Sequence, residues 1–195
     1  MKRVFIIHGF GGVPDGGWFP WLLGELAEKN IPAVSLTMPH TNEPIVSEWV
    51  ETIAKNVSEI QDEVILVGHS LGVPAVLRYL ETLPTNKRIY AVVLVSGFIM
   101  PLQPENRESD FRKIDVFVDP AIDLENVRAK IDSATVIHGR LDTIVPFSHA
   151  EIISKGLGAE LVEVKQGDHF SQKTEPICRA LPQALEAIVS LLPKA

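Results

Sequence analysis

The chain has 195 residues, of which 46% are hydrophobic and 22% are charged. This length and balance predict one globular domain over residues 1–195 and exclude a disordered or fibrous protein. The formal net charge of −7, with no basic run to offset it, argues against nucleic acid or an anionic membrane surface as a partner.

A secretory leader, a membrane span and a disulfide framework are not expected. The apolar run Val4–Ile7 is too short for a signal peptide, and no apolar segment approaches the ~20 residues of a membrane span. Cys178 is the single cysteine, which excludes an intramolecular disulfide and a cysteine-based zinc site. We expect it to be buried filler in a helix. These features fit a reducing compartment, and the expected location is cytoplasmic.

The first predicted strand, Arg3–His8, leads into the glycine-rich loop Gly9–Gly17. This loop lacks the lysine of a phosphate-binding P-loop, and Val13-Pro14 stands where a dinucleotide fingerprint needs its third glycine. No nucleotide is therefore expected here, and no other cofactor is indicated. A His-Gly turn after such a strand can instead offer a backbone N–H to a developing oxyanion, and Phe10 is the residue placed to do so.

Apolar spacing predicts the next elements. Apolar residues that recur at i, i+4 predict a first helix over Trp18–Asn30 and a second over about Ile45–Ile60. A second strand, Ile31–Leu36, lies between them. The side chain of Trp18 is expected in the core or in the wall of a pocket.

The stretch Val64–Gly72 organises the chain. Val64–Val67 are four apolar residues, typical of a strand buried on both faces in a parallel sheet, and Val73–Leu83 has the pattern of a helix. The G-x-S-x-G pentapeptide between them fits either a plain Gly/Ser turn or a nucleophile elbow, and the flanking strand and helix favour the elbow. An elbow would hold Ser70 in a strained turn at the carboxyl edge of the sheet, with the N–H of Leu71 facing an oxyanion. A Cβ at either glycine would collide with the neighbouring strand or helix.

A fourth predicted strand, Ile89–Val95, precedes the least regular region, Phe98–Asp132. The three prolines and mixed charges of this region allow two interpretations, a solvated connection or a small cap over residues 98–132. A cap is favoured, because the region leaves the same edge of the sheet as Ser70. One helix is expected within it, near Leu124–Ile131.

The rest of the chain also alternates between strand and helix. Strands are predicted over Ala134–His138 and Leu161–Lys165, and helices over Phe147–Leu157 and Pro182–Leu192. This alternation predicts the α/β class: a sheet of about six mostly parallel strands, with helices on both faces and a minimal cap. Ligands bind such sheets beyond the carboxyl ends of the strands.

A serine nucleophile needs an adjacent base and an acid that orients the base, in the chain order Ser, Asp/Glu, His. Asp142 and His169 each follow a predicted strand at the sheet edge that carries Ser70. The acid could also follow the fourth strand, but no carboxylate stands there, which points to Asp142. Asp168 is expected to cap a turn, because adjacent side chains in a loop usually diverge.

Three further histidines, His8, His69 and His138, also end predicted strands. Together with His169 they could supply a metal site, but the chain lacks His-Glu-x-x-His or similar ligand spacing, and His8 and His138 precede glycine in tight turns. No metal is therefore expected, and these three imidazoles are expected to orient loops through hydrogen bonds. The remaining histidines are expected at the surface: His40 and His149.

Short motifs run along the chain: His8-Gly9-Phe10, Trp18-Phe19-Pro20-Trp21-Leu22, Met38-Pro39, Gly68-His69-Ser70-Leu71-Gly72, Leu94-Val95-Ser96-Gly97-Phe98, Asp142-x-x-Val145-Pro146-Phe147 and Gly167-x-His169-Phe170. In these motifs the chain resembles the small serine hydrolases of the retinoblastoma-binding-protein type, including their bacterial YdeN-like branch. The resemblance implies a compact α/β-hydrolase with little cap that acts on small carboxyl esters. It also implies Ser70 as nucleophile, His169 as base and Asp142 as orienting acid. The resemblance is weakest over Met100–Asp132.

The expected activity is that of a serine hydrolase whose partner is a small-molecule carboxyl ester, with thioesters and amides as less favoured substrates. Little sequence is available for a cap, which predicts a shallow apolar pocket for short or medium acyl groups. Four side chains are expected to border this pocket: Trp18, Phe98, Val145 and Phe170. The alternative is a non-catalytic or dual-role protein-binding module on a hydrolase fold, since fold and function separate readily. A protein partner is not otherwise indicated.

Overall fold

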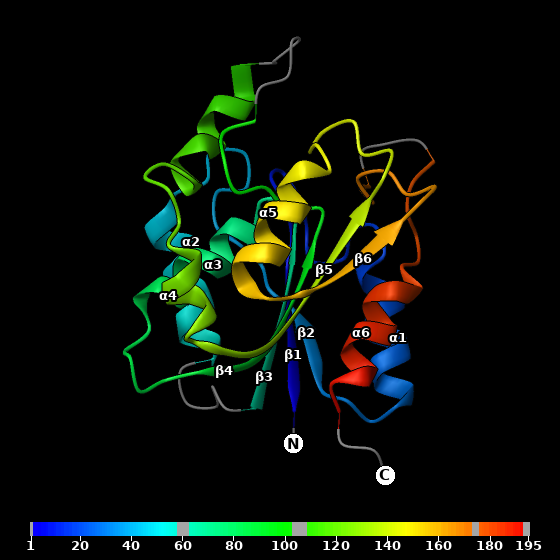
Figure 1. Ribbon diagram of the computed structural model, residues 1–195. Helices are drawn as coiled ribbons and strands as arrows, with labels where there is room; N and C mark the ends of the chain where they lie inside the picture. The colour runs from blue at the N-terminus through cyan, green and yellow to red at the C-terminus, as the bar shows by residue number, and fades with distance from the viewer. Residues whose placement is uncertain (1, 58–62, 103–108, 173–175, 193–195) are drawn as a thin grey trace.

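The computed structural model describes residues 2–57, 63–102, 109–172 and 176–192 (Figure 1). Within these residues, six strands form one parallel sheet in the order β2-β1-β3-β4-β5-β6. The strands are β1 (Arg3–Ile7), β2 (Ala33–Ser35), β3 (Val64–His69), β4 (Ile89–Val95), β5 (Ile131–Gly139) and β6 (Glu160–Val164). The predicted parallel α/β sheet is therefore confirmed.

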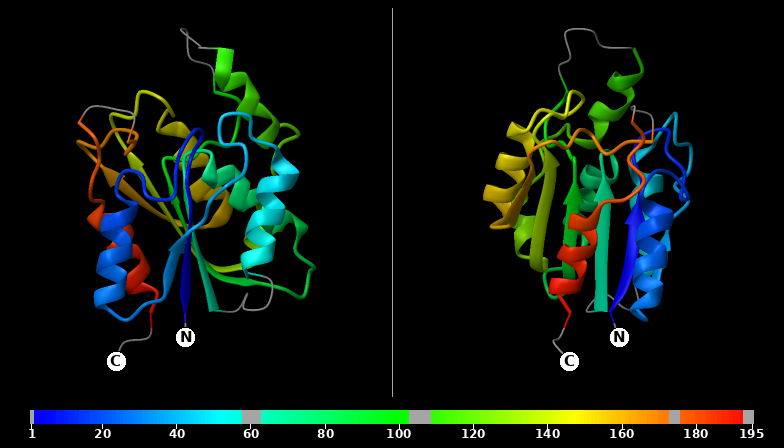
Figure 2. Two further views of the ribbon diagram at one scale, coloured as in Figure 1. Left: turned by 180° about the vertical axis from the view of Figure 1, so that it is seen from behind. Right: turned by 90° about the vertical axis from the view of Figure 1, so that its right-hand side faces the viewer.

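Helices cover both faces of the sheet (Figures 1 and 2). One face carries α1 (Phe19–Glu28) and α6 (Pro182–Ser190). The opposite face carries α2 (Val46–Val57), α3 (Gly72–Thr82), α4 (Leu124–Arg128) and α5 (Ser148–Leu157). A separate cluster of buried apolar side chains fills the space between the sheet and each of these two helical layers.

β3 lies at the centre of the sheet, and all its residues are buried. Its side chains alternate between the two cores, because successive residues of a strand point to opposite faces. Val64 and Leu66 pack under α2 and α3, whereas Ile65 and Val67 pack under α1 and α6. The expectation of a strand buried on both faces is confirmed.

The boundary between α4 and β5 differs from the prediction. β5 begins at Ile131 rather than Ala134, and the helix expected to reach Ile131 ends at Arg128. Ile131 pairs with Ile89 of β4, and the Ile89 N–H donates to the carbonyl of Lys130 at 2.8 Å. Pairing with β4 therefore places Ile131 in a strand, although the local apolar spacing predicts a helix there.

The region between β4 and α4 contains the 3₁₀ helix η2 (Ser109–Phe117), which stands beyond the carboxyl ends of the strands (Figures 1 and 2). Leu102 and Ile114 from this region are buried. Charged residues flank Ile114, and Leu102 stands between a proline and a glutamine, so the apolar pattern in the sequence was too weak to predict an element here. The predicted continuation of α2 up to Ile60 falls outside the described residues.

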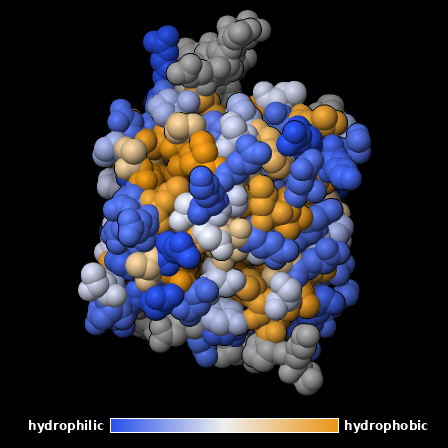
Figure 3. All heavy atoms as spheres, in the orientation of Figure 1, coloured by the Kyte–Doolittle hydropathy of each residue, from blue (hydrophilic) through white to orange (hydrophobic). Residues whose placement is uncertain are grey.

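Apolar side chains that remain exposed are spread over several elements, among them Ile45, Val116 and Leu141. On the face drawn in Figure 3, apolar groups form separate patches with hydrophilic residues between them. In the part of the chain that the structure describes, no helix combines the length and the apolar content needed to cross a membrane.

Candidate active site

The turn between β3 and α3 holds Ser70 in a strained conformation. Ser70 has a φ of +54°, a region that residues other than glycine rarely adopt. Its N–H donates to the carbonyl of Val95 at 2.9 Å, and its own carbonyl accepts from the N–H of Val73 at 3.0 Å. Hydrogen bonds from β4 and from α3 therefore hold the turn, and the predicted strained elbow is confirmed.

The two glycines of the pentapeptide stand where the backbone is crowded. A Cβ at Gly72 would overlap the carbonyl oxygen of Ile7 in β1. A Cβ at Gly68 would lie 2.8 Å from the carbonyl oxygen of Gly72. The expected collisions with the neighbouring strand and helix are therefore confirmed, and they explain why both positions need glycine.

The glycine-rich loop after β1 passes directly over Ser70. A Cβ at Gly9 would lie 2.9 Å from Cβ of Ser70 and 3.3 Å from its Oγ. Leu71 follows Ser70 in the chain at the start of α3, and Phe10, which follows Gly9 in this loop, lines the same cavity as Ser70. Among the hydrogen bonds of the described residues, none uses the N–H of Leu71.

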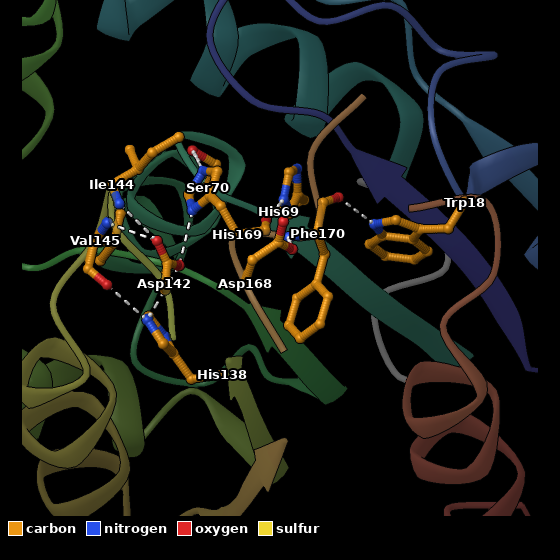
Figure 4. A network of polar contacts seen from close by, with 10 residues as sticks. All are labelled: Trp18, His69, Ser70, His138, Asp142, Ile144, Val145, Asp168, His169 and Phe170. Carbon is orange, nitrogen blue, oxygen red and sulfur yellow. Dashed lines mark hydrogen bonds and ion pairs between the residues drawn. The ribbon is translucent and has the colours of Figure 1, made fainter. Parts of the chain in front are cut away.

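Ser70, His169 and Asp142 form one chain of hydrogen bonds (Figure 4). Nε2 of His169 lies 3.0 Å from Oγ of Ser70, and Nδ1 of His169 lies 2.8 Å from Oδ2 of Asp142. The other carboxylate oxygen, Oδ1, accepts from the N–H groups of Ile144 at 2.9 Å and Val145 at 2.8 Å. The structure thus brings together three residues that the sequence places far apart.

The carboxyl group of Asp142 is ionised at neutral pH. Its side chain is fully buried, and burial alone would raise its pKa. Hydrogen bonds from the side chains of His138 and His169 outweigh this effect and hold the pKa of Asp142 well below its usual range. The buried carboxylate can therefore orient His169 and stabilise its protonated form.

Three side chains hold the backbone of His169 and Phe170 (Figure 4). Nε2–H of His69 donates to the carbonyl of His169 at 2.9 Å, and Nε1–H of Trp18 donates to the carbonyl of Phe170 at 3.2 Å. Oδ1 of Asp168 accepts from the N–H of Phe170 at 2.8 Å, so the expectation that Asp168 caps a turn is confirmed. Phe170 has a φ of +52°, and these bonds fix the turn that presents the His169 ring to Ser70.

The expected role of His8, His69 and His138 in orienting loops is also confirmed. His8 bonds through Nδ1 to the carbonyl of Gly9, and His138 bonds through Nε2 to the carbonyl of Val145, each at 2.9 Å. Each of these imidazoles is therefore directed at a backbone group. Within the residues that the structure describes, no three His, Cys, Asp or Glu side chains come together as metal ligands would.

Two other expectations are wrong. His149 is buried rather than at the surface, because its Nδ1 accepts the N–H of Ile99 at 3.2 Å. Cys178 is half-buried rather than buried, and it lies in the irregular segment before α6 rather than in a helix. Its Sγ–H donates to the carbonyl of Ala180 at 3.3 Å. Burial raises the pKa of this thiol to about 11, which makes it a poor nucleophile. His40 is exposed, as expected.

Burial also changes the titration of the histidines around the site. Burial lowers the pKa of His69 to about 3, with a smaller contribution from the nearby His169. It lowers the pKa of His8 and of His149 in the same way, and a hydrogen bond to Gly9 partly opposes it at His8. These three imidazoles are therefore neutral at pH 7.

A cavity of about 110 Å³ opens beside Ser70 and His169, between the glycine-rich loop, the loop after β6 and the region of η2. Trp18 and Phe170 line it, as predicted from the sequence. No Asp, Glu, Lys or Arg is among the described residues that line it. Other apolar residues that line the cavity were not predicted from the sequence: Val13, Phe19, Leu102, Ile114 and Ile144.

Phe98 and Val145, also predicted at the pocket, do not line the cavity. Both side chains are fully buried in the core between the sheet and α2–α5. The backbone after Phe98 is bound to His149 of α5, which draws this segment into the core. Both backbone groups of Val145 bond to site residues, its N–H to Asp142 and its carbonyl to His138, and its side chain packs away from the cavity.

The chain is similar to known hydrolases over most of its length. Residues 4–183 match the family described as "Serine hydrolase". The chain is 34% identical over 169 residues to the hydrolase YdeN of Bacillus subtilis (strain 168), covering 87% of this chain and 86% of that protein. It is 26% identical over 178 residues to the serine hydrolase RBBP9 of Rattus norvegicus, covering 89% of each. The crystal structure of the ydeN gene product from B. subtilis matches with a TM-score of 0.89 and 31% identity, covering 98% of each chain.

Gly9→Ala tests the close approach of the glycine-rich loop to Ser70. The added methyl would meet Cβ of Ser70 at 2.9 Å, so either the loop or Ser70 must shift. We expect hydrolase activity to fall by ~10-fold or more, because small displacements of reacting groups are costly. Gly24→Ala in α1 is the matched control, since its methyl meets nothing within 4 Å and should stabilise the helix by ~0.5–1 kcal/mol. Equal activity in the two variants would contradict the crowding described here.

The free energy of unfolding should fall as pH is lowered from 7 to 5. The folded protein keeps His8, His69 and His149 neutral, whereas the unfolded chain protonates them below their ordinary pKa of 6.5. The unfolded state therefore binds more protons, and each such imidazole lowers stability by up to ~1.4 kcal/mol per pH unit. Urea unfolding at pH 7, 6 and 5 measures this slope. His69→Gln should reduce it, whereas a replacement of the exposed His40 should not; a constant stability over this range would show that the buried imidazoles are not the cause.

Proposed function

The chain belongs to the serine hydrolase family and has the α/β-hydrolase fold, and we propose that it hydrolyses small, uncharged carboxyl esters through an acyl-enzyme on Ser70. The observation that carries the proposal is the hydrogen-bonded chain from Oγ of Ser70 through His169 to the buried carboxylate of Asp142. A serine oxygen next to an imidazole that a carboxylate orients is the arrangement that acyl transfer requires.

In the proposed reaction, Nε2 of His169 takes the proton of Ser70 while Oγ attacks the ester carbonyl. The negative charge that develops on the carbonyl oxygen would be stabilised by the backbone N–H groups of Phe10 and Leu71, helped by the N-terminus of α3. The protonated His169 then passes its proton to the leaving alcohol. Water then attacks the acyl group with His169 acting again as base. The bond between the acyl carbon and Oγ of Ser70 breaks, His169 returns the proton to Oγ, and the acid product leaves. Asp142 keeps the ring in the required tautomer throughout.

The cavity supports a small and uncharged substrate. Its volume of about 110 Å³ is well below the ~300–1,000 Å³ of pockets that bind drug-sized ligands. Its apolar lining carries no charged side chain among the described residues, so a charged acyl group would lose its hydration without gaining an ion pair. We therefore propose short acyl groups as substrates. We also propose a cytoplasmic location, on the evidence of the single cysteine.

Ser70→Ala tests the proposed nucleophile. We expect kcat/KM for p-nitrophenyl acetate to fall by at least ~10³-fold, because the chemical step then lacks its attacking oxygen. A fluorophosphonate probe should label the wild-type protein at Ser70 and leave the variant unlabelled. Ser154→Ala is the matched control, because this buried serine of α5 lies outside the cavity and its hydroxyl donates to the carbonyl of Glu151 in the same helix. Undiminished hydrolysis by Ser70→Ala would end the proposal, whereas a wild-type protein that stays inactive and unlabelled would favour a binding role.

Acyl chain length tests the proposed pocket. Across p-nitrophenyl esters from acetate to palmitate, kcat/KM should be highest for short chains and fall as the chain outgrows the cavity. Ile114→Ala should move the optimum to longer chains, because this buried side chain of η2 lines the cavity. Val116→Ala serves as the control, since Val116 lies on the same element but is 52% exposed and outside the cavity lining. A wild-type preference for palmitate would contradict a small acyl pocket.

A further inference from the structure

The carboxylate of Asp142 contacts a second imidazole, that of His138, in addition to the imidazole of His169. His138, near the end of β5, has no exposed surface. Its Nε2 lies 2.9 Å from the carbonyl oxygen of Val145 and 3.3 Å from Oδ2 of Asp142 (Figure 4). The loop that carries Asp142 therefore closes back onto the strand that precedes it.

These contacts define the tautomer of His138. A carbonyl oxygen only accepts hydrogen bonds, so Nε2 must carry the proton that it donates to Val145. The same N–H can be shared with Oδ2 of Asp142, which also accepts. Nδ1 then carries no proton, and among the described residues it has no hydrogen-bond partner. A proton on Nδ1 would be a buried donor without an acceptor, which is unfavourable.

The carboxylate of Asp142 is thus contacted by four donors. Oδ1 accepts from the backbone N–H groups of Ile144 and Val145, while Oδ2 faces both His169 and His138. The two backbone bonds hold Oδ1 in place, but they do not hold Oδ2, so the carboxylate could still pivot around Oδ1. A donor at Oδ2 that is itself held by the sheet restricts this rotation, and therefore the position of the His169 ring.

We propose that His138 is a positioning residue for ester hydrolysis, acting through Asp142 on the position and proton affinity of His169. The inference rests on the proposed function, because it assigns His138 to the same reaction. His138 does not line the cavity, so it has no direct contact with substrate. Its loss should therefore lower kcat and leave KM nearly unchanged.

The shared hydrogen bond also has an electrostatic consequence. The N–H of His138 draws part of the negative charge of Oδ2, which weakens the attraction between Asp142 and the protonated form of His169. Removal of His138 should therefore move the acid limb of the kcat/KM profile to higher pH.

Other titratable groups face this pair of rings from the surrounding elements, and they must be unchanged in the comparison. β3 presents His69 to His169, and α5 presents His149 to His138. β6 presents Glu163 at the register position of His138, with its carboxylate 4.0 Å from Arg140. The remaining group lies in the loop of His169: Asp168.

A matched pair of variants tests the proposal. Methionine and glutamine have similar length, but only glutamine can place an N–H donor near the position of Nε2. We expect His138→Met to lower kcat for p-nitrophenyl acetate by ~10-fold or more, with KM within about 2-fold of wild type. The acid limb should move up by ~0.5–1 pH unit. His138→Gln should restore most of kcat and the wild-type limb, and His149→Asn should leave the limb in place.

Several outcomes would overturn the proposal. In a folded His138→Met variant, a kcat near wild type or an unmoved acid limb would show that His138 has only a packing role. Equal loss in His138→Gln and His138→Met would exclude the donor as the cause.

The ¹⁵N shifts of His138 in the wild-type protein provide a test that does not depend on folding of a variant. They should show a protonated Nε2 and a bare Nδ1, and the opposite tautomer would overturn the proposal. The wild-type protein also separates the two hypotheses. Absence of Ser70-dependent turnover would refute the proposed function itself, whereas Ser70-dependent turnover that His138 variants leave unchanged would refute only this inference.

Discussion

The buried hydrogen bond between Asp142 and His169 is the interaction on which the geometry of the site depends. It joins an ionised carboxylate to an imidazole at 2.8 Å in a region closed to solvent, where such bonds are strong. Burial alone would disfavour the charge on Asp142, and two backbone N–H groups and two imidazoles offset that effect. The remaining ring nitrogen of His169 is left facing Ser70, so one buried charge determines which nitrogen meets the serine oxygen.

The parallel sheet brings these groups together. Each of the three residues follows a different strand, and parallel strands all end at the same edge, so long separations in sequence become short distances in space. The backbone segments around Ser70 approach one another closely, and this requires glycine at particular positions. Gly72 lets α3 start against β1, and Gly9 lets the first loop pass over Ser70. The loop of His169 is held by side chains from β3 and from the start of α1, so the base is fixed by elements that also shape the pocket.

The strands, the helices and the meeting of Ser70, Asp142 and His169 could be predicted because they depend on local patterns. Apolar periodicity identifies a strand or helix, and the position just after a strand identifies its edge. The pocket could not be predicted in this way. Whether Phe98 faces the cavity or the core depends on a hydrogen bond between distant segments, at Ile99 and His149. Ile114 of η2 also lines the pocket. It lies in a segment of mixed charge, where no apolar periodicity indicates which side chains face the site. The second contact of Asp142, with His138, depends on the path of a loop that no periodic pattern describes.

The most direct test of this account is the rate at which a fluorophosphonate labels Ser70 in Asp142→Asn compared with the wild-type protein at pH 8. Asparagine preserves the size of the side chain but removes the charge and can favour the wrong tautomer of His169. The account predicts labelling slower by ~10³-fold or more, in a variant whose fold is intact by circular dichroism. Labelling at the wild-type rate would contradict it, because Ser70 would then be activated without the carboxylate.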